Sequence, residues 1–340
     1  MASPLAGTQW LAHDGGMHTS LTQRRIRLPH GIELSCRCAG DEGQPVLMFL
    51  HGFPEAAFVW DELLAHFSQA QHGGYFCIAP NLRGYADSSA PLPGPRSEPY
   101  RAKHLMQDLQ ALAQACSSGP LAALVAHDWG GALAWNLASL QPGLMQRLVI
   151  INAPHPALFA RELSHSPAQQ AASRYMNFLA RPDAAKRLAE GDFRRLWALF
   201  EGMGATNGPQ PWLCEAVREQ YRQVWRAGLA GPCAYYAASP LRPPEPGSTA
   251  HQLQVPAVLA HTPVPTQVIW GMADTALLPG LLDGLADHVP DLELHRIADA
   301  THWIVHEQPA LVARLIGGFL ARPGSAPELS TQAAGQAGGS

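Results

Sequence analysis

Short β-rich runs alternate with helical runs through the first 154 residues of this chain. Residues 45–50 and 75–79 are short apolar runs of the kind that form buried strands. Between them, apolar side chains recur at positions i, i+3, i+4 and i+7 over residues 60–67, which is one face of a helix. Strands separated by helices usually pair in parallel, so this part of the chain predicts a mostly parallel sheet with helices on its faces.

The alternation stops at Pro154-His155-Pro156 and resumes about 100 residues later. The residues between are rich in Ala, Arg and aromatic side chains and show no convincing strand. A strand at 266–270, a helix at 277–288, a strand at 292–297 and a helix at 309–320 are predicted after them. A helical insertion that returns to the sheet suggests a cap over a site at the sheet edge.

These patterns divide the chain into five predicted parts. They are an N-terminal extension, 1–23; the first part of the core, 24–154; the helical cap, 155–250; the second part of the core, 251–322; and a disordered tail, 323–340.

Charge and motif content exclude several classes of function. The 23 basic and 27 acidic residues give a net charge of -4 and form no basic run, so nucleic acid is not an expected partner. Neither a signal-peptide pattern nor an apolar stretch of membrane-spanning length occurs, so we expect a cytoplasmic protein without a membrane partner. The six cysteines are expected to be free thiols, and no zinc-site spacing occurs, so neither a metal nor a cofactor is expected.

The segment Ala126-His127-Asp128-Trp129-Gly130 joins a predicted strand to a predicted helix. Small residues two positions before and after Asp128 would let the strand and the helix approach closely, and the central side chain would then project from a strained turn. Taken alone, an aspartate here could simply cap the helix. The serine version of this turn, Gly-x-Ser-x-Gly, is absent, which disfavours serine esterase chemistry.

An acid and a histidine follow Asp128 in the chain order expected for a nucleophile, an acid and a base. Asp274 comes shortly after the predicted strand 266–270, and His302 comes after the strand 292–297. Both positions are the carboxyl ends of strands, where catalytic side chains of such sheets gather. The sequence therefore predicts Asp128 as nucleophile, His302 as general base and Asp274 as the residue that orients His302.

From about residue 24 to 321 the chain resembles the epoxide hydrolase branch of the α/β-hydrolase superfamily, which also includes haloalkane and fluoroacetate dehalogenases. The resemblance implies an α/β-hydrolase fold: a mostly parallel eight-stranded sheet flanked by helices, with the helical cap inserted after the sixth strand. The motifs that carry it are His51-Gly52-Phe53-Pro54-Glu55, Asn81-Leu82-Arg83-Gly84-Tyr85, His127-Asp128-Trp129-Gly130-Gly131, Trp270-Gly271 before Asp274, and His302-Trp303 before Glu307-Gln308-Pro309.

The resemblance also implies two cap tyrosines that hold and protonate the epoxide oxygen. Tyr175 looks like the first and Tyr236 like the second, with Tyr235 as the alternative for the second. Two positions depart from the family pattern: Ala237 stands where an arginine commonly follows the second tyrosine, and Thr301 where a glycine usually precedes the histidine.

The backbone N–H groups of Phe53 and Trp129 are the expected oxyanion hole, because a helix N-terminus favours negative charge. We expect the side chains of four residues to line the substrate pocket: Phe53, Pro54, Trp129 and Trp303.

Together these features predict an epoxide hydrolase for a small apolar epoxide, which would form a covalent ester on Asp128 that activated water then cleaves. A haloalkane or haloacid dehalogenase could use the same nucleophile. However, Phe53 has no side-chain donor for a halide, and residues 129–132 contain no arginine to hold a carboxylate. A non-catalytic small-molecule receptor on the same scaffold is the remaining alternative. Detoxification is one possible role, and cap helices could support a homodimer.

Overall fold

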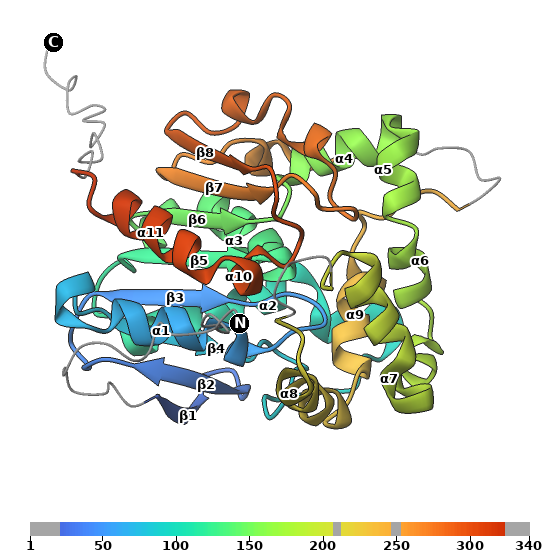
Figure 1. The fold of residues 1–340 in the computed structure, drawn as a ribbon, viewed down its shortest axis with the longest axis horizontal. Coiled ribbons are helices and arrows are strands. Elements are labelled where there is room, and N and C mark those ends of the chain that lie inside the picture. Colours follow the sequence, from blue (N-terminus) through green and yellow to red (C-terminus); the bar gives the residue numbers. More distant parts are fainter. Residues whose placement is uncertain (1–20, 207–211, 246–252, 324–340) are drawn as a thin grey trace, which may run out of the picture.

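The computed structural model describes residues 21–206, 212–245 and 253–323. Residues 1–20 and 324–340, nearly all of the expected extension and tail, lie outside the described residues, as does the predicted cap boundary at residue 250. The described part contains one eight-stranded sheet (Figure 1). Its strands are β1 (Thr22–Arg27), β2 (Glu33–Ala39), β3 (Val46–Leu50), β4 (Phe76–Pro80), β5 (Ala123–His127), β6 (Leu148–Ile151), β7 (Thr266–Gly271) and β8 (Leu292–Ile297).

The strand order is β1-β2-β4-β3-β5-β6-β7-β8. The pairs β1/β2 and β2/β4 are antiparallel, and the other five pairs are parallel. Register aligns the carboxyl ends of the central strands, since Leu50 pairs with Ala126 and Ile151 pairs with both His127 and Ile269. The loops that follow β3, β5, β6 and β7 therefore meet at one edge of the sheet. The predicted eight-stranded, mostly parallel α/β-hydrolase sheet is confirmed.

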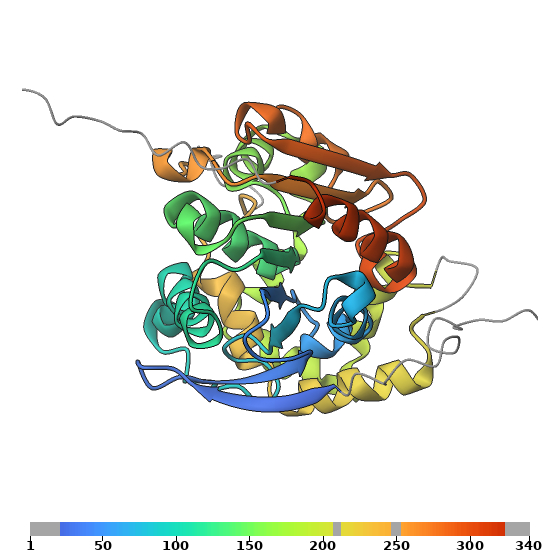
Figure 2. The ribbon, with the colours of Figure 1, turned by 90° about the vertical axis from the view of Figure 1, so that its left-hand side faces the viewer.

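Helices cover both faces of the sheet, as parallel strands require (Figure 2). Two of them, α2 and α3, lie on one face, and α1 and α11 lie on the other. The core helices are α1 (Asp61–Phe67), α2 (Ala102–Cys116), α3 (Asp128–Leu140), α10 (Ile304–Glu307) and α11 (Pro309–Leu320); the 3₁₀ helices of this part are η1 (Ala57–Trp60), η2 (Ala70–His72), η3 (Pro95–Tyr100) and η4 (Pro142–Leu144).

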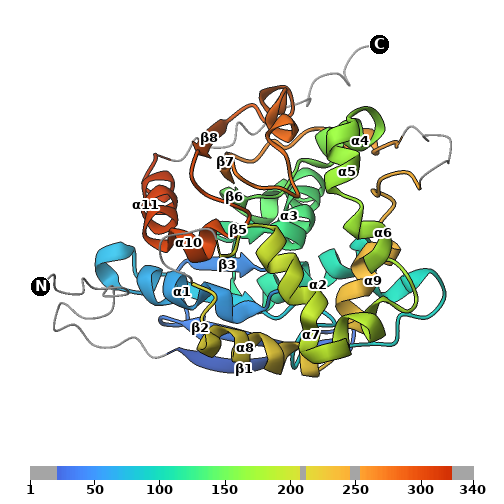
Figure 3. The ribbon, with the colours of Figure 1, turned by 45° about the vertical axis from the view of Figure 1, so that its right-hand side comes forward.

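Within the described residues between β6 and β7 there are six further α-helices, which follow the sixth strand as predicted. They are α4 (Pro156–His165), α5 (Pro167–Ala172), α6 (Tyr175–Leu179), α7 (Ala184–Gly202), α8 (Glu215–Arg226) and α9 (Ala230–Ala238), followed by η5 (Ala257–Ala260). Figures 1 and 3 show α6 to α9 gathered beside the sheet. Helix α8 contacts the loop after β3, because Trp225 Nε1 donates to the Pro54 carbonyl at 2.7 Å. This group of helices therefore covers the carboxyl edge of the sheet.

The predicted helix at 277–288 is wrong. The structure has two short 3₁₀ helices there, η6 (Pro279–Leu282) and η7 (Leu285–Asp287). Between them Gly284 adopts a φ of +80°, which an α-helix does not allow. The predicted strands, by contrast, end within about two residues of the observed ones, and the helix 309–320 matches α11 at both ends.

Candidate active site

Asp128 stands at the turn between β5 and α3 with a backbone φ of +48°. A positive φ is strained for a residue with a side chain, and the surrounding structure must hold it in place. Two glycines allow that approach. A Cβ on Gly130 would lie 2.5 Å from the Leu50 carbonyl oxygen, and one on Gly52 would lie 2.3 Å from Asp128 Cβ. The small residues of the motif therefore serve to bring the strand, the helix and the neighbouring loop together.

The carboxylate of Asp128 contacts both the loop after β3 and the loop after β8. Its Oδ1 accepts a hydrogen bond from the backbone N–H of Phe53 at 2.7 Å. Its Oδ2 lies 3.8 Å from His302 Nε2. Among the described residues, no hydrogen bond from the Trp129 N–H to this carboxylate is present, so Phe53 alone of the two expected donors is engaged.

His302 and Asp274 form a buried ion pair behind the nucleophile. His302 Nδ1 lies 2.7 Å from Asp274 Oδ2, and that oxygen also accepts from Asn152 Nδ2 at 2.8 Å. The other carboxylate oxygen accepts from two backbone N–H groups, those of Ala276 and Leu277. These hydrogen bonds hold the Asp274 carboxylate in one orientation. Because Nδ1 of His302 is bound to that carboxylate, its Nε2 faces Asp128.

The charges of this group raise the pKa of His302 to about 9. Burial alone would lower it, but the negative charges of Asp274 and then of Asp128 outweigh burial. Burial would likewise raise the pKa of Asp274, and the positive charge of His302 instead lowers it below its usual value. The ion pair with Asp274 therefore favours the protonated form of His302 in the resting site.

Two tyrosines of the helices between β6 and β7 lie near Asp128: Tyr175, which is partly buried, and Tyr236, which is buried. Tyr175 begins α6 and Tyr236 lies in α9, with their ring centroids 6.1 Å apart. The ring of Tyr236 also stands at 90° to that of Trp129, 5.2 Å away. Burial raises the pKa of both hydroxyls well above the usual value, and the charge of Asp128 raises it further. Both tyrosines are therefore protonated and can act as hydrogen-bond donors.

The neighbouring Tyr235 has a different environment. Its hydroxyl donates to the Arg83 carbonyl oxygen at 2.9 Å and is buried there. The Arg83 side chain in turn forms two hydrogen bonds with Asp108, at 2.7 and 2.6 Å. Tyr235 thus connects α9 to the core, whereas its neighbour Tyr236 faces the nucleophile.

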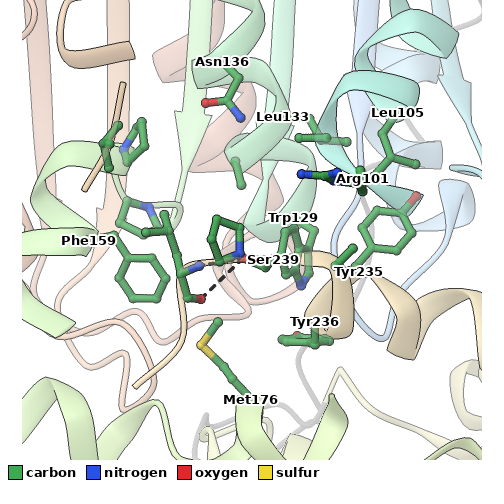
Figure 4. A pocket seen from close by; sticks show the side chains of 18 of the residues that line it. Arg101, Leu105, Trp129, Leu133, Asn136, Phe159, Met176, Tyr235, Tyr236 and Ser239 are labelled. Atoms are coloured by element: carbon green, nitrogen blue, oxygen red, sulfur yellow. Dashed lines mark hydrogen bonds between the residues drawn. The ribbon is translucent and has the colours of Figure 1, made fainter. Parts of the chain in front are cut away.

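Asp128 opens onto a cavity of about 400 Å³ between α3 and the cap helices (Figure 4). Apolar and aromatic side chains make up most of its wall, including Trp129, Leu133, Phe159, Met176 and Tyr236. Such a cavity suits a small apolar molecule.

Three of the four predicted pocket residues do not line this cavity; of the four, Trp129 does. The ring of Phe53 packs edge-on against Tyr236, and the Pro54 carbonyl accepts from a cap tryptophan. Trp303 follows His302 in the chain; its ring meets that of His302 edge-on at 5.0 Å and stacks on Phe200 at 4.3 Å. The prediction for Phe53, Pro54 and Trp303 is therefore corrected: Phe53 packs against the lining residue Tyr236, whereas Pro54 and Trp303 contact Trp225 and Phe200, which lie outside the cavity wall.

Glu55 is buried, and the sequence predicted no role for it although it belongs to the motif His51-Gly52-Phe53-Pro54-Glu55. Its carboxylate oxygens lie 3.1 Å from His127 Nδ1, 2.7 Å from His306 Nε2 and 2.9 Å from the Tyr221 hydroxyl. Burial opposes the charge of Glu55, but His127 and His306 hold its pKa well below the usual value. His127 Nε2 also lies 2.9 Å from the carbonyl oxygen of His302. The network therefore links a cap helix to the backbone that carries His302.

No group of side chains among the described residues could hold a metal ion. Within the same described ranges, no helix is both long and apolar enough to cross a membrane.

The fold and the site together define an α/β-hydrolase. The family model for the alpha/beta hydrolase fold matches residues 45–309, and the chain belongs to this family. It is 33% identical over 294 residues to the AB hydrolase superfamily protein YfhM of Bacillus subtilis, an alignment that covers 86% of this chain and 95% of that protein.

Within the family, the chain belongs to the epoxide hydrolase branch. It is 30% identical over 297 residues to Epoxide hydrolase 3 of Xenopus tropicalis, covering 85% of this chain and 75% of the relative. The crystal structure of Bacillus megaterium epoxide hydrolase in complex with an inhibitor superposes with a TM-score of 0.77 at 28% identity, covering 88% of this chain and all of the other.

Proposed function

We propose that this protein is an epoxide hydrolase, which converts an epoxide and water to a vicinal diol through an ester on Asp128. One observation carries the proposal: two protonated tyrosine hydroxyls and a carboxylate nucleophile are positioned together at an apolar cavity. A carboxylate attacks a saturated carbon, and the hydroxyls supply the proton that an opened epoxide needs. The relatives named as epoxide hydrolases support the same activity.

In the first step an oxygen of Asp128 bonds to a ring carbon of the epoxide. The bond from that carbon to the ring oxygen breaks, and the oxygen takes a proton from Tyr175 or Tyr236. The tyrosinate left behind then regains a proton from solvent. We assign the Phe53 N–H, which already binds Oδ1 at 2.7 Å, to the oxygen that remains the carbonyl of the ester.

The second step cleaves the ester with water. Formation of the ester removes the negative charge of Asp128, and this charge is one of the causes that raise the pKa of His302. The pKa of His302 therefore falls in the intermediate, and the imidazolium loses its proton to solvent. The neutral imidazole can then take a proton from the water that attacks the ester carbonyl. Asp274 balances the imidazolium that forms. The bond from the carbonyl carbon to the alkyl oxygen then breaks, and this oxygen takes the proton from His302 and leaves as the second hydroxyl of the diol. The remaining proton of the water passes from the acid to His302, which restores Asp128 as a carboxylate.

The substrate that this site fits is a small apolar epoxide. We assign the helices between β6 and β7 to a cap that supplies both tyrosines and covers the carboxyl edge of the sheet. A dehalogenase would release an anion that needs hydrogen bonds without proton transfer. Two tyrosines facing the nucleophile favour the epoxide, whose oxygen must be protonated.

Product analysis of the purified protein tests this function. Incubation with styrene oxide should give the diol, measured by chromatography, while chlorinated and fluorinated substrates should release no halide. A His302→Gln variant given styrene oxide should accumulate an ester on Asp128, visible as a mass increase of the peptide that carries it. Halide release without diol formation would overturn the proposal in favour of a dehalogenase.

A further inference from the structure

The cavity extends well past the nucleophile along helix α3. Asp128, Trp129, Ala132, Leu133 and Asn136 all line it, and together they form one face of that helix. Asn136 lies eight residues after Asp128, which is about 12 Å along the helix axis. Figure 4 shows its amide at the far side of the cavity from Tyr236 and Met176. A substrate that fills the cavity therefore reaches Asn136 with its unreactive end.

The amide of Asn136 has no hydrogen-bond partner within the described part of the chain. Its Oδ1 is shielded from solvent and makes no hydrogen bond. The neighbouring wall is apolar, with Leu133, Pro156, Phe159 and Leu259. A buried polar group without a partner destabilises the fold unless something else satisfies it, so its presence in a pocket wall calls for an explanation. Oδ1 has almost no surface that a molecule in the cavity could touch, so the Nδ2 group, which is on the cavity side in Figure 4, is the donor that a bound substrate can engage.

We propose that Asn136 is a specificity residue that hydrogen-bonds a neutral polar group at the distal end of the substrate. This inference rests on the proposed epoxide hydrolase function. It narrows the substrate class to elongated epoxides in which an apolar spacer separates the ring from an ester, amide, ether or hydroxyl. The Nδ2 group of asparagine is a donor, and each of these groups carries an oxygen that can accept from it.

A charged distal group is disfavoured by the other polar residues of the wall. Arg101 and Lys103 also line the cavity, but both pair with Glu98, at 3.3 and 2.6 Å. Their side chains are 55% and 60% exposed, so water screens their charges. Asn136 is neutral and more enclosed, and a substrate group can bind it without losing the solvation of an ion.

Matched substrates test the proposal. Methyl 10,11-epoxyundecanoate carries an ester carbonyl about as far from its epoxide as Asn136 lies from Asp128, and 1,2-epoxytridecane has the same chain length without that group. The quantity measured is the ratio of kcat/KM for the ester to kcat/KM for the alkane. We expect an Asn136→Leu substitution to lower this ratio about fivefold, the effect of one neutral hydrogen bond. Using the ratio cancels general effects of the substitution on turnover.

Two further variants keep the test decisive. Asn136→Ala removes the amide without adding bulk. It should therefore lower the ratio in the same way, even if the leucine variant disturbs the packing of α3. Gln223→Leu removes a side-chain amide from an exposed position of α8 outside the cavity and should retain the wild-type ratio.

The contrary outcomes separate this inference from the proposed function. Diol from both probes with an equal ratio in wild type and both Asn136 variants would overturn the inference alone. In a second contrary outcome, the wild type turns over the free acid, 10,11-epoxyundecanoate, faster than the methyl ester. If Lys103→Gln abolished this advantage and Asn136→Leu kept it, the inference would be overturned in favour of ionic recognition. No diol from any probe would overturn the proposed function and this inference together.

Discussion

Two adjacent tyrosines of helix α9 provide a matched pair of substitutions. Tyr235 and Tyr236 are both buried and both pack against Trp129, yet the Tyr235 hydroxyl donates to the Arg83 carbonyl, whereas the Tyr236 hydroxyl lies close enough to feel the charge of Asp128. Replacing each with phenylalanine removes one hydroxyl and leaves the ring. The two variants should therefore lose different properties: stability for Tyr235→Phe and catalysis for Tyr236→Phe.

The magnitudes follow from the partner that each hydroxyl serves. In Tyr235→Phe the buried Arg83 carbonyl loses its donor, which costs about 1–3 kcal/mol of unfolding free energy. In Tyr236→Phe the oxygen of the opening epoxide loses one of two donors. A hydrogen bond to a charged group contributes about 1.5–3 kcal/mol, so kcat/KM should fall about 10- to 150-fold. The double variant Tyr175→Phe/Tyr236→Phe, which lacks both donors, should fall further still.

Urea unfolding and initial rates with styrene oxide measure both effects on the same samples. We expect Tyr235→Phe to unfold at lower urea while it keeps kcat/KM within about threefold, since its ring and its neighbours remain. Tyr236→Phe should show the opposite pattern. Equal loss of activity in two variants that are both folded would refute the assignment of Tyr236, and a greater loss in Tyr235→Phe would reverse it.

Three further predictions concern the charges and the packing around the nucleophile. The pKa of His302 is raised from 6.5 to about 9, so its protonation stabilises the fold fully below about pH 6.5 and this contribution is lost as the pH rises through about 9. The stability deficit of His302→Gln in urea unfolding should therefore narrow between about pH 6 and about pH 9.5, and a constant deficit would contradict the raised pKa. Gly52→Ala places a Cβ 2.3 Å from Asp128 Cβ and should lower kcat about 100-fold in steady-state assays, whereas Gly318→Ala, with open space around it, serves as the control and should keep wild-type kcat. Glu55→Gln removes a buried charge that three groups contact and should cost about 3–5 kcal/mol in urea unfolding; a loss below about 1 kcal/mol would show that the network does not hold the cap.

The fold could be predicted in outline because its signals are local. The apolar runs at 45–50 and 75–79, which form β3 and β4, are each too short for a helix, and the proline cluster at 154–156 marks the start of the insertion. The helix predicted at 277–288 failed because its apolar spacing is interrupted by Gly284, whose left-handed conformation ends a helix. Periodicity alone could not show that.

The site was predictable where chain order and strand ends specify position. Asp128, Asp274 and His302 come together because parallel strands align their carboxyl ends at one edge. The pocket wall was less predictable, since consecutive residues point in different directions: His302 faces Asp128, while Trp303 packs on Phe200.

The contacts of Glu55 could not be predicted from the sequence either. Glu55 meets His306 and Tyr221 across 251 and 166 residues of chain, and no local pattern encodes contacts at that separation. Its place in the motif His51-Gly52-Phe53-Pro54-Glu55 was the one available signal.

The central claim is that Asp128 forms and loses an ester in each turnover. Multiple turnovers of styrene oxide in ¹⁸O-labelled water, followed by mass spectrometry of the peptide that carries Asp128, test it most directly. The ester mechanism predicts that water attacks the carbonyl carbon of Asp128, so heavy oxygen accumulates in its carboxylate. Diol formation with an unlabelled Asp128 would contradict the mechanism, because water would then have attacked the epoxide itself.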